Sequence, residues 1–359
     1  MRIAVGLSGG VDSAVTASLL NDQGHDVFGV TMAIWDQSVH STGATGKHAC
    51  FGPEEQQDIK EAETLCKSLG IPFQVYDCSA AYKKHILAYF RREYLAGRTP
   101  NPCIQCNQQI KLDVLPSMIL EAGERFDKFA TGHYARVEFD VKSERYLLKK
   151  AADTAKDQTY FLYRLTQQQL QKLHLPLGPF TKTEVRDWAR KKGIAVSDKQ
   201  DSQDFYSGNY NDLIDIREKT GNIVHINGQV LGKHPGIWNF TVGQRKGLGV
   251  SWHEPLYVIR LDAHTNQVIV GPSSLIYNHA FFVDQLNWIA FDELTSPLDV
   301  TARIRSSQTE FTAVIEPHSM DAISVHADQP VHAITPGQSA VFYQGEIVMG
   351  GGIINRVIE

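Results

Sequence analysis

Two of the five cysteines, Cys103 and Cys106, lie three residues apart in the stretch NPCIQCN. A C-x-x-C pair can ligate zinc or an iron–sulfur cluster, form a redox couple, or provide a nucleophilic thiol with a resolving partner. Zinc is the weaker interpretation, because the sequence has no second C-x-x-C or H-x-x-H pair to complete four ligands. The cysteines are odd in number and unevenly spaced, which favours a reducing cytosol over a disulfide framework, so we expect a cytoplasmic protein.

A second chemical signature, GLSGGVDS (Gly6 to Ser13), follows an apolar strand-like run and opens a helical pattern. Glycines let the backbone approach a phosphate, and serine hydroxyls and the free N–H groups of a helix N-terminus bind it. The loop has no lysine after its glycines and therefore differs from the loop of phosphoryl-transfer NTPases. The Asp12 carboxylate has the hard oxygen ligands that suit Mg²⁺. The stretch predicts a nucleotide-phosphate site.

Composition sets limits on the class of protein. The chain has 359 residues, 42% of them hydrophobic and 21% charged, which predicts two or three globular domains. Its longest apolar runs fall short of the roughly 20 residues of a membrane span, and the N-terminus does not resemble a signal peptide, so we expect no membrane association. The net charge of −5 argues against a general polyanion binder, although a local basic patch can still hold a folded RNA.

Hydrophobic patterns predict three domains. In the first half, strand-like runs alternate with helical patterns, which indicates an α/β domain with a parallel sheet and ligands at the carboxyl ends of its strands. Residues 157–192 are predicted to be helical. Short β-prone runs separated by Gly, Asn and Pro follow, and the last of them predict a barrel of about six strands. The expected domains are 1–208, 209–276 and 277–359.

Longer stretches carry a family resemblance. SGGVDS resembles the PP-loop of the ATP pyrophosphatases (adenine nucleotide alpha hydrolase-like enzymes), which cleave ATP between its α- and β-phosphates. Five further stretches, in order along nearly the whole chain, resemble the tRNA-uridine 2-sulfurtransferase family: GRTPNPCIQCNQQIK (97–111), ATGHYAR (130–136), KDQTYFLY (156–163), residues 221–250 and residues 335–354. The resemblance implies a PP-loop domain, a small β-rich central domain and a C-terminal β-barrel.

The same resemblance implies a reaction and its contacts. The family makes 2-thiouridine at the tRNA wobble position U34, by adenylating the C2 carbonyl oxygen with ATP and Mg²⁺ and then transferring sulfur with release of AMP and pyrophosphate. By position, the ATP contacts are Gly6, Leu7, Ser8, Gly9, Gly10, Val11, Asp12 and Ser13, with Met32 and Gly132 at the adenosine. The tRNA contacts, centred on the anticodon stem-loop, are Asn101, Pro102, Cys103, His133, Lys156, Asp157, Gln158, Arg305, Ser306 and Gln338.

Arg245 and Lys246 in GQRKG are a further candidate, because two cations and exposed backbone donors within five residues are typical of a phosphate-binding loop. An isolated charge such as Lys156 or Arg305 is more often an ordinary surface residue. Gln338, in a TPGQ turn, could simply stabilise that turn.

The cysteines depart from the family pattern. Cys106 holds the place of the family's catalytic cysteine, and Cys103 stands where an aspartate is commoner. The second family cysteine, which is thought to carry the persulfide, is replaced by Tyr206 in DSQDFYSG (201–208). A phenol cannot carry a persulfide, so two alternatives stay open. Cys103 and Cys106 could form a persulfide and disulfide relay, or they could hold a 4Fe–4S cluster with Cys50 as the best third-ligand candidate.

The expected partners are tRNA and either a sulfur donor protein, namely a cysteine desulfurase or a sulfur carrier, or inorganic sulfide. Two rival functions remain. An ATP-pyrophosphatase ligase acting on a small metabolite would keep SGGVDS without needing the barrel or the C-x-x-C. An RNA-binding module with an inactive nucleotide pocket is disfavoured by the intact loop serines, glycines and Asp12.

Overall fold

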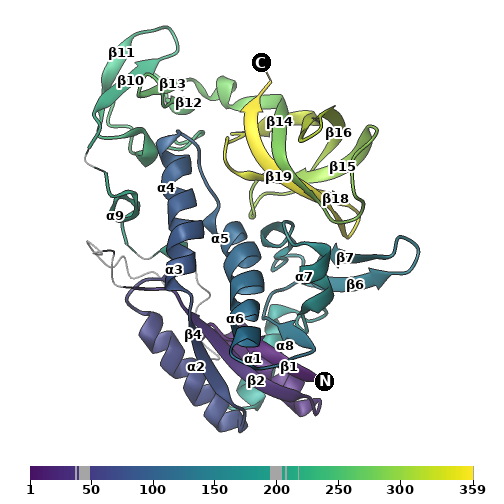
Figure 1. The fold of residues 1–359 in the computed structure, drawn as a ribbon. Helices are drawn as coiled ribbons and strands as arrows, with labels where there is room; N and C mark the ends of the chain where they lie inside the picture. Colours follow the sequence, from purple (N-terminus) through teal and green to yellow (C-terminus); the bar gives the residue numbers. More distant parts are fainter. Residues whose placement is uncertain (37–38, 40–48, 195–203, 207, 217, 359) are drawn as a thin grey trace. The chain divides into compact units, whose positions relative to one another are not determined.

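The computed structural model describes residues 1–359 except 37–38, 40–48, 195–203, 207, 217 and 359 (Figure 1). The chain divides into two compact units, which are described separately. The first unit contains residues 1–87, 102–212 and 346–348. The second contains residues 88–101, 213–345 and 349–359.

The first unit is built on a five-stranded parallel sheet with the order β4-β2-β1-β5-β8. Its strands are β1 (Arg2–Gly6), β2 (Asp26–Ala33), β4 (Phe73–Asp77), β5 (Lys128–Ala130) and β8 (Leu173–His174). Successive strands pass to one side of β1 and then to the other, so the strand order reverses at β1. In open parallel sheets, ligands bind outside the carboxyl ends of the strands at such a point.

Helices accompany the sheet in the order that the sequence predicts. They are α1 (Val11–Asp22), α2 (Glu55–Leu69), α3 (Ser79–Tyr82), α5 (Pro102–Gln105), α6 (Leu115–Glu121), α7 (Gln167–Lys172) and α8 (Lys182–Lys191). Two π-helical stretches, η1 (Lys83–Leu87) and η2 (Cys106–Val114), continue α3 and α5. Apolar side chains of β1, α1 and α2 form one core, and α1 and α8 enclose a second with Tyr134 and Leu177.

Three features of the first unit differ from the sequence prediction. The prediction of a helix from residue 157 is wrong for its first part, which forms only the short 3-10 turn η3 (Thr159–Phe161). An antiparallel hairpin, β6 (Arg136–Asp140) and β7 (Arg145–Lys149), was not predicted. A two-stranded parallel sheet also joins β3 (Ala49–Phe51) to β9 (Asp204–Tyr206).

The second unit is mainly β-structure. It includes the helices α4 (Ala88–Leu95) and α9 (Tyr210–Ile214, shared with the first unit), and the 3-10 turns η4 (Ile237–Asn239) and η5 (Ser273–Ile276). A four-stranded sheet of order β11-β10-β13-β12 contains β10 (Gly221–His225), β11 (Val230–His234), β12 (Tyr257–Asp262) and β13 (Gln267–Gly271).

A closed barrel of six strands follows: β14 (Tyr277–Trp288), β15 (Leu298–Arg303), β16 (Phe311–Ser319), β17 (Ala322–His332), β18 (Ser339–Gln344) and β19 (Ile347–Val357). Pairing between β14 and β19 closes the barrel. The predicted fold class, with a parallel sheet, a β-rich middle and a six-stranded barrel, is therefore confirmed. Among the described residues, no helix is long and apolar enough to cross a membrane.

Candidate active site

The Gly6–Ser13 loop leaves the carboxyl end of β1 and enters the N-terminus of α1. The Leu7 N–H donates to the Val30 carbonyl on β2 (2.8 Å), and the Ser8 N–H donates to the Ser13 hydroxyl (3.2 Å). Gly9 has a φ of +68°, and a Cβ there would lie 3.0 Å from the Asp58 backbone, so only glycine fits. Gly10, the N-cap, provides no side-chain cap, which leaves the first N–H groups of α1 available for an anion.

Asp12 in the first turn of α1 is fixed by two partners from distant segments. The Lys182 ammonium donates to Oδ1 (2.8 Å) and Oδ2 (2.7 Å), and the Tyr134 hydroxyl donates to Oδ1 (2.8 Å). The Lys182 side chain is 10% exposed and that of Asp12 is 25% exposed, so most of this ion pair is shielded from water. The pair places a largely buried cation beside the Gly6–Ser13 turn, whereas the loop of phosphoryl-transfer NTPases carries its lysine within the loop itself.

A capping box positions Lys182 as the first residue of α8. The Thr181 hydroxyl accepts from the Glu184 N–H (3.3 Å), and the Glu184 carboxylate accepts from the Thr181 N–H (2.7 Å). The Lys182 N–H donates to Asp153 (2.9 Å), which satisfies a further free donor at this helix end. The sequence TKTE therefore fixes the backbone from which the Lys182 side chain reaches Asp12.

The two residues predicted at the adenosine lie at strand ends close to the loop. Met32 is half-buried near the carboxyl end of β2, next to Thr31, whose hydroxyl donates to the Leu7 carbonyl (2.6 Å). Gly132 follows β5, and a Cβ at Gly132 would lie 2.7 Å from the Asp12 carbonyl carbon and 2.8 Å from the Ser13 nitrogen. A larger residue at this position would displace the start of α1.

The C-x-x-C lies on a helix that changes from α- to π-helical geometry at Cys106. The side-chain amides of the three residues after Cys106 hold this helix in place. Asn107 donates to the Phe161 carbonyl (3.2 Å), Gln108 to the Arg164 carbonyl (2.9 Å), and Gln109 to the Gln105 side chain (2.6 Å). Short π-helical segments occur frequently at functional sites. This anchoring holds both thiols on a well-packed element.

Cys103 and Cys106 are half-buried, and burial of their thiols is the main influence on their pKa values. Burial, together with neighbouring Cys50 and Cys106, raises the pKa of Cys103 to about 12, and Lys111 opposes the shift. Burial also raises the pKa of Cys106 to about 12, with Lys111 again the opposing cation. Each group is therefore a thiol near neutral pH, and its thiolate depends on a nearby positive charge such as that of Lys111.

The arrangement of the described residues gives no support for a metal site at these cysteines. Within the part of the chain that the structure describes, no group of three or more His, Cys, Asp or Glu side chains is placed to hold a metal ion. Cys50, Cys103 and Cys106 are all described and all free. The iron–sulfur alternative therefore has no preformed three-ligand site, and we derive no chemical step from it.

His133 and the 156–158 segment lie together beside Tyr134. His133 Nδ1 is 2.8 Å from the Thr131 hydroxyl, and burial lowers the pKa of His133 to about 3, so the imidazole is neutral. The Gln158 side chain accepts from the Tyr134 N–H (2.9 Å), and Asp157 accepts from the Ala151 N–H (3.1 Å). Asp157 and Gln158 thus support the fold here, whereas Lys156 is exposed.

In the second unit, the GQRKG turn presents both of its cations to solvent. Arg245 and Lys246 are exposed. Gln244 braces the turn, since its side chain accepts from the Thr241 N–H (3.0 Å) and donates to the Lys246 carbonyl (2.9 Å). A rigid turn with two exposed cations suits contact with phosphates.

Gln338 and Arg305 have structural contacts inside the second unit. Gln338 donates to the carbonyls of Thr99 (3.0 Å) and Pro100 (3.2 Å), and so holds the segment that leads to Asn101. Arg305 donates to the Ala333 carbonyl (3.2 Å) and the Thr335 hydroxyl (3.1 Å). Ser306 is exposed, and Pro102, in the first unit, is buried at the start of α5.

Known proteins resemble the chain over its whole length. Three family models match it: the tRNA methyl transferase HUP domain at 1–206, the tRNA methyl transferase PRC-barrel domain at 214–272 and the aminomethyltransferase beta-barrel domain at 278–354. The tRNA-specific 2-thiouridylase MnmA of Endomicrobium trichonymphae is 47% identical over 99% of both chains. That of Acetivibrio thermocellus is 43% identical over 98% of this chain and 99% of its own. This chain belongs to the tRNA-specific 2-thiouridylase family.

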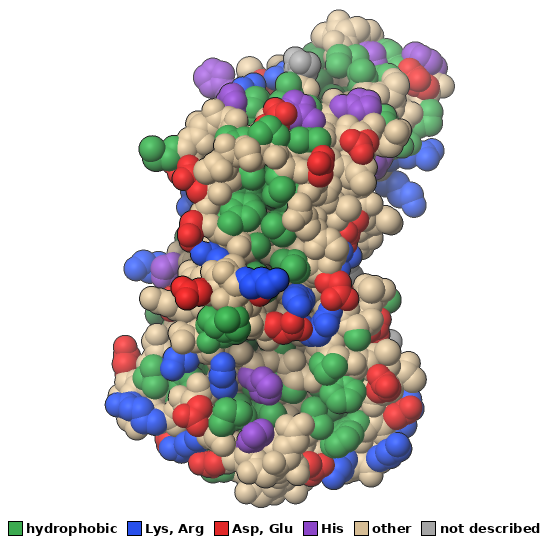
Figure 2. Space-filling model, turned by 90° about the vertical axis from the view of Figure 1, so that its right-hand side faces the viewer, with side chains coloured by type: hydrophobic (Ala, Val, Ile, Leu, Met, Phe, Trp, Pro, Cys, Tyr) green, Lys and Arg blue, Asp and Glu red, His purple; other side chains and the backbone are tan. Residues whose placement is uncertain are grey.

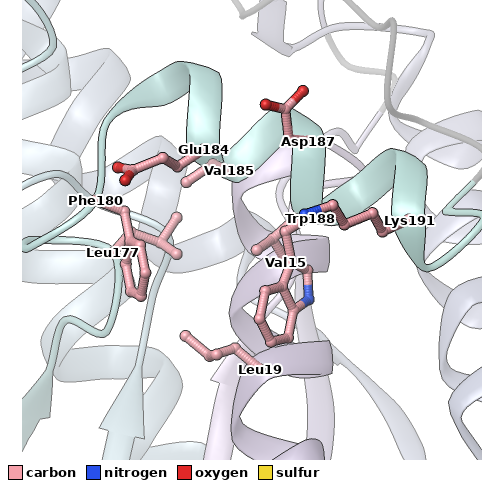
Figure 3. A pocket seen from close by; sticks show the side chains of 9 residues that line it. All are labelled: Val15, Leu19, Leu177, Phe180, Glu184, Val185, Asp187, Trp188 and Lys191. Carbon is pink, nitrogen blue, oxygen red and sulfur yellow. The ribbon is translucent and has the colours of Figure 1, made fainter.

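One cavity in the first unit lies apart from the predicted site residues. It measures about 240 Å³ and lies between α1 and α8, where Trp188, Phe180, Leu177 and Val15 point into it (Figure 3). Of the residues predicted for the site, none is among its lining side chains in the described structure. Because its walls are mainly apolar, we assign it no part in the reaction.

Charges of both signs are mixed on the surface. On the face shown in Figure 2, acidic and basic side chains of the described residues are interspersed. The net charge of −5 therefore comes from a small excess of acidic side chains.

The structure adds three residues that the sequence interpretation missed. Lys182 and Tyr134 fix Asp12, and Lys111 lies close enough to influence the charge of both C-x-x-C thiols. The capping box at Thr181 was a readable signal for the start of α8. The sequence offered no signal for the pairing of Lys182 with Asp12.

Proposed function

We propose that this protein is an ATP-dependent sulfurtransferase that thiolates C2 of the wobble uridine U34 of tRNA. The observation that carries the proposal is the Gly6–Ser13 turn at the reversal point of the parallel sheet, in a chain that matches 2-thiouridylases from end to end. The phosphate-binding turn and the C-x-x-C belong to one compact unit. A nucleotide site and a thiol pair are the two parts that adenylation followed by sulfur transfer requires.

ATP is bound by the loop residues Gly6 to Ser13 and by the N-terminal dipole of α1, with Met32 and Gly132 at the adenosine. The Lys182 ammonium supplies positive charge beside the phosphates. Asp12 does not fit as a direct Mg²⁺ ligand, because three of its approximately four acceptor positions are occupied. Magnesium would therefore arrive with ATP, held by phosphate oxygens and water.

Adenylation prepares the uridine for substitution. The C2 carbonyl oxygen attacks the α-phosphorus, the bond to the pyrophosphate breaks, and pyrophosphate leaves. The C2 oxygen is then part of an AMP ester, and AMP is a far better leaving group than an amide oxygen. The positive groups around the phosphate turn stabilise the charge that develops on the phosphates.

Sulfur transfer uses the two thiols of the C-x-x-C. Cys106 carries a persulfide, whose outer sulfur attacks C2 and displaces AMP. The Cys103 thiolate then attacks the Cys106 sulfur, which breaks the sulfur–sulfur bond, leaves 2-thiouridine and forms a Cys103–Cys106 disulfide. A dithiol reductant restores both thiols by supplying two electrons. Lys111 favours the thiolate forms against the burial that raises both pKa values.

The tRNA is held through its anticodon stem-loop, with U34 turned into the site. Arg245 and Lys246 bind phosphates from the 209–276 domain, and the 277–359 barrel contributes Arg305, Ser306 and Gln338. We assign Asn101, Pro102 and Cys103 to the target base, and His133, Lys156, Asp157 and Gln158 to further contacts with the tRNA. The sulfur comes as a persulfide on a cysteine desulfurase or a sulfur carrier, in a reducing compartment such as the cytosol. Inorganic sulfide enters instead by attacking the Cys106 sulfur of the Cys103–Cys106 disulfide, which leaves a persulfide on Cys106 and frees Cys103 as a thiol.

The test measures AMP and pyrophosphate together, with and without tRNA. We expect release of both products only when the tRNA carries an unmodified uridine at position 34, and no stimulation by the same tRNA with cytidine at that position. Release that is independent of tRNA would overturn the proposal and favour a ligase acting on a small metabolite. An Asp12→Ala variant that still thiolates would contradict the assignment of the nucleotide site.

A further inference from the structure

The five cysteines differ sharply in their access to solvent. Cys66 and Cys78 are buried, with 0% and 1% of their surface exposed. Cys103 and Cys106 are half-buried, and Cys50 is exposed. The thiols of the C-x-x-C therefore lie where chemistry can be shielded from water, whereas Cys50 lies where another protein can reach it.

Strand pairing places Cys50 beside the segment that ends at Tyr206. In the parallel β3–β9 pair, Ala49 lies opposite Asp204 and Phe51 opposite Tyr206, so Cys50 lies between these two pairs. Tyr206 itself is 1% exposed, and its hydroxyl donates to Asp212 (3.0 Å). Tyr206 thus fills a core position. The reactive side chain of this small sheet is that of Cys50, on the neighbouring strand β3.

The aromatic side chain of Tyr82 links β3 to the C-x-x-C. Phe51, next to Cys50, stacks on Tyr82 with ring centroids 5.0 Å apart and an interplanar angle of 19°. Helix α3, which carries Tyr82, packs against η2, which begins with Cys106. Burial raises the pKa of Tyr82 well above its usual value, and the charges of Cys106, Cys50 and Cys103 add to this effect. Tyr82 thus connects the strand that carries Cys50 with the helix that carries Cys106.

We propose that Cys50 is the thiol that receives sulfur from the donor protein and passes it to Cys106. This inference rests on the proposed function, whose relay begins with a persulfide on Cys106. Of these three cysteines, Cys50 is accessible, and Cys103 and Cys106 are partly shielded. That division matches a sulfur path that starts at the surface and ends at the substrate.

Each transfer balances as a thiol–persulfide exchange. The Cys50 thiolate attacks the outer sulfur of the donor's persulfide, the donor's sulfur–sulfur bond breaks, and the donor leaves as a thiolate. The Cys106 thiolate then attacks the outer sulfur on Cys50, which frees the Cys50 thiolate and leaves the persulfide on Cys106. Neither exchange changes the number of electrons, so the only reductant is the dithiol that later opens the Cys103–Cys106 disulfide.

The test compares two sulfur donors on a Cys50→Ala variant. One is a cysteine desulfurase charged with radioactive sulfur, and the other is a small-molecule persulfide that can diffuse to Cys106. We expect transfer into tRNA from the charged desulfurase to fall about tenfold or more, since its protein-bound persulfide has lost the accessible thiol, and transfer from the small persulfide to change less than about twofold. Cys78→Ala, which removes a buried thiol, is the matched control and keeps both rates.

A second measurement traps the persulfide in a Cys103→Ser/Cys106→Ser variant, where mass spectrometry should find the extra sulfur on Cys50. Unchanged transfer from the desulfurase to Cys50→Ala would overturn the inference, as would a persulfide found only on another residue. A different result would contradict the proposed function itself. If Cys106 does not carry the persulfide, the Cys106→Ser variant should thiolate tRNA at the normal rate with the small persulfide.

Discussion

The buried ion pair between Lys182 and Asp12 gives a quantitative prediction. Replacing Lys182 with methionine keeps a long apolar side chain but leaves the Asp12 carboxylate with only the Tyr134 hydroxyl and water. Removing one partner of a buried pair typically costs 3–5 kcal/mol. Because the Asp12 side chain is still 25% exposed, water compensates in part, and we expect the lower end of that range, about 3 kcal/mol.

A loss of that size should be visible in calorimetric melting of the apoprotein. For a unit of this size, 1 kcal/mol shifts the melting temperature by about 2–4 °C, so we expect Lys182→Met to melt about 6–12 °C lower. The matched control is Lys191→Met on the same helix, where the lysine is exposed and the expected shift is close to zero. Adding Asp12→Asn to Lys182→Met should restore part of the loss, because the unpaired charge is removed. A shift of Lys182→Met no larger than that of the control would refute the reasoning.

Three further predictions concern tRNA binding, ATP binding and acid stability. Neutralising Arg245 and Lys246 to glutamine should weaken tRNA binding and reduce the slope of log Kd against log salt concentration by about 1.5–2, whereas Lys233→Gln should not. Gly132→Ala should raise the Kd for ATP, measured by calorimetric titration, because its Cβ would lie 2.7 Å from backbone of the first turn of α1. The folded-state pKa of His133 is lowered from 6.5 to about 3, so the unfolded chain binds the proton first and stability should fall as pH drops from about 6.5 towards 3. His133→Gln should lose less stability than the original protein between pH 7 and pH 5 in denaturant unfolding.

Local patterns were enough to predict the sheet and the glycine-rich turn between β1 and α1. The Gly6–Ser13 stretch combines its glycines, its serines and the start of a helix within eight residues, so neighbouring residues alone define it. The strand periodicity that precedes it is equally local. The fold class could be predicted for the same reason, because each strand and helix of the parallel sheet carries its own pattern.

The residues that contact Asp12 and form the β3–β9 pair could not be predicted, because they come from remote parts of the chain. Lys182 lies 170 residues from Asp12, and nothing in its own surroundings marks it as a partner of the loop. The β3–β9 pair consists of two three-residue strands, which are too short to show a period. The helix expected from residue 157 was wrong because the Asp157 and Gln158 side chains accept hydrogen bonds from the N–H groups of Ala151 and Tyr134, and these contacts hold the segment in a turn.

The most direct test of the central claim follows the oxygen atom of the uridine. A tRNA carrying a heavy oxygen isotope at C2 of U34 is incubated with the enzyme, ATP, a persulfide donor and a dithiol, and the AMP is analysed by mass spectrometry. Adenylation of the C2 oxygen predicts one heavy oxygen in the phosphate of each AMP, in a one-to-one ratio with the 2-thiouridine formed. AMP without the label, or label released into water while 2-thiouridine forms, would contradict the account.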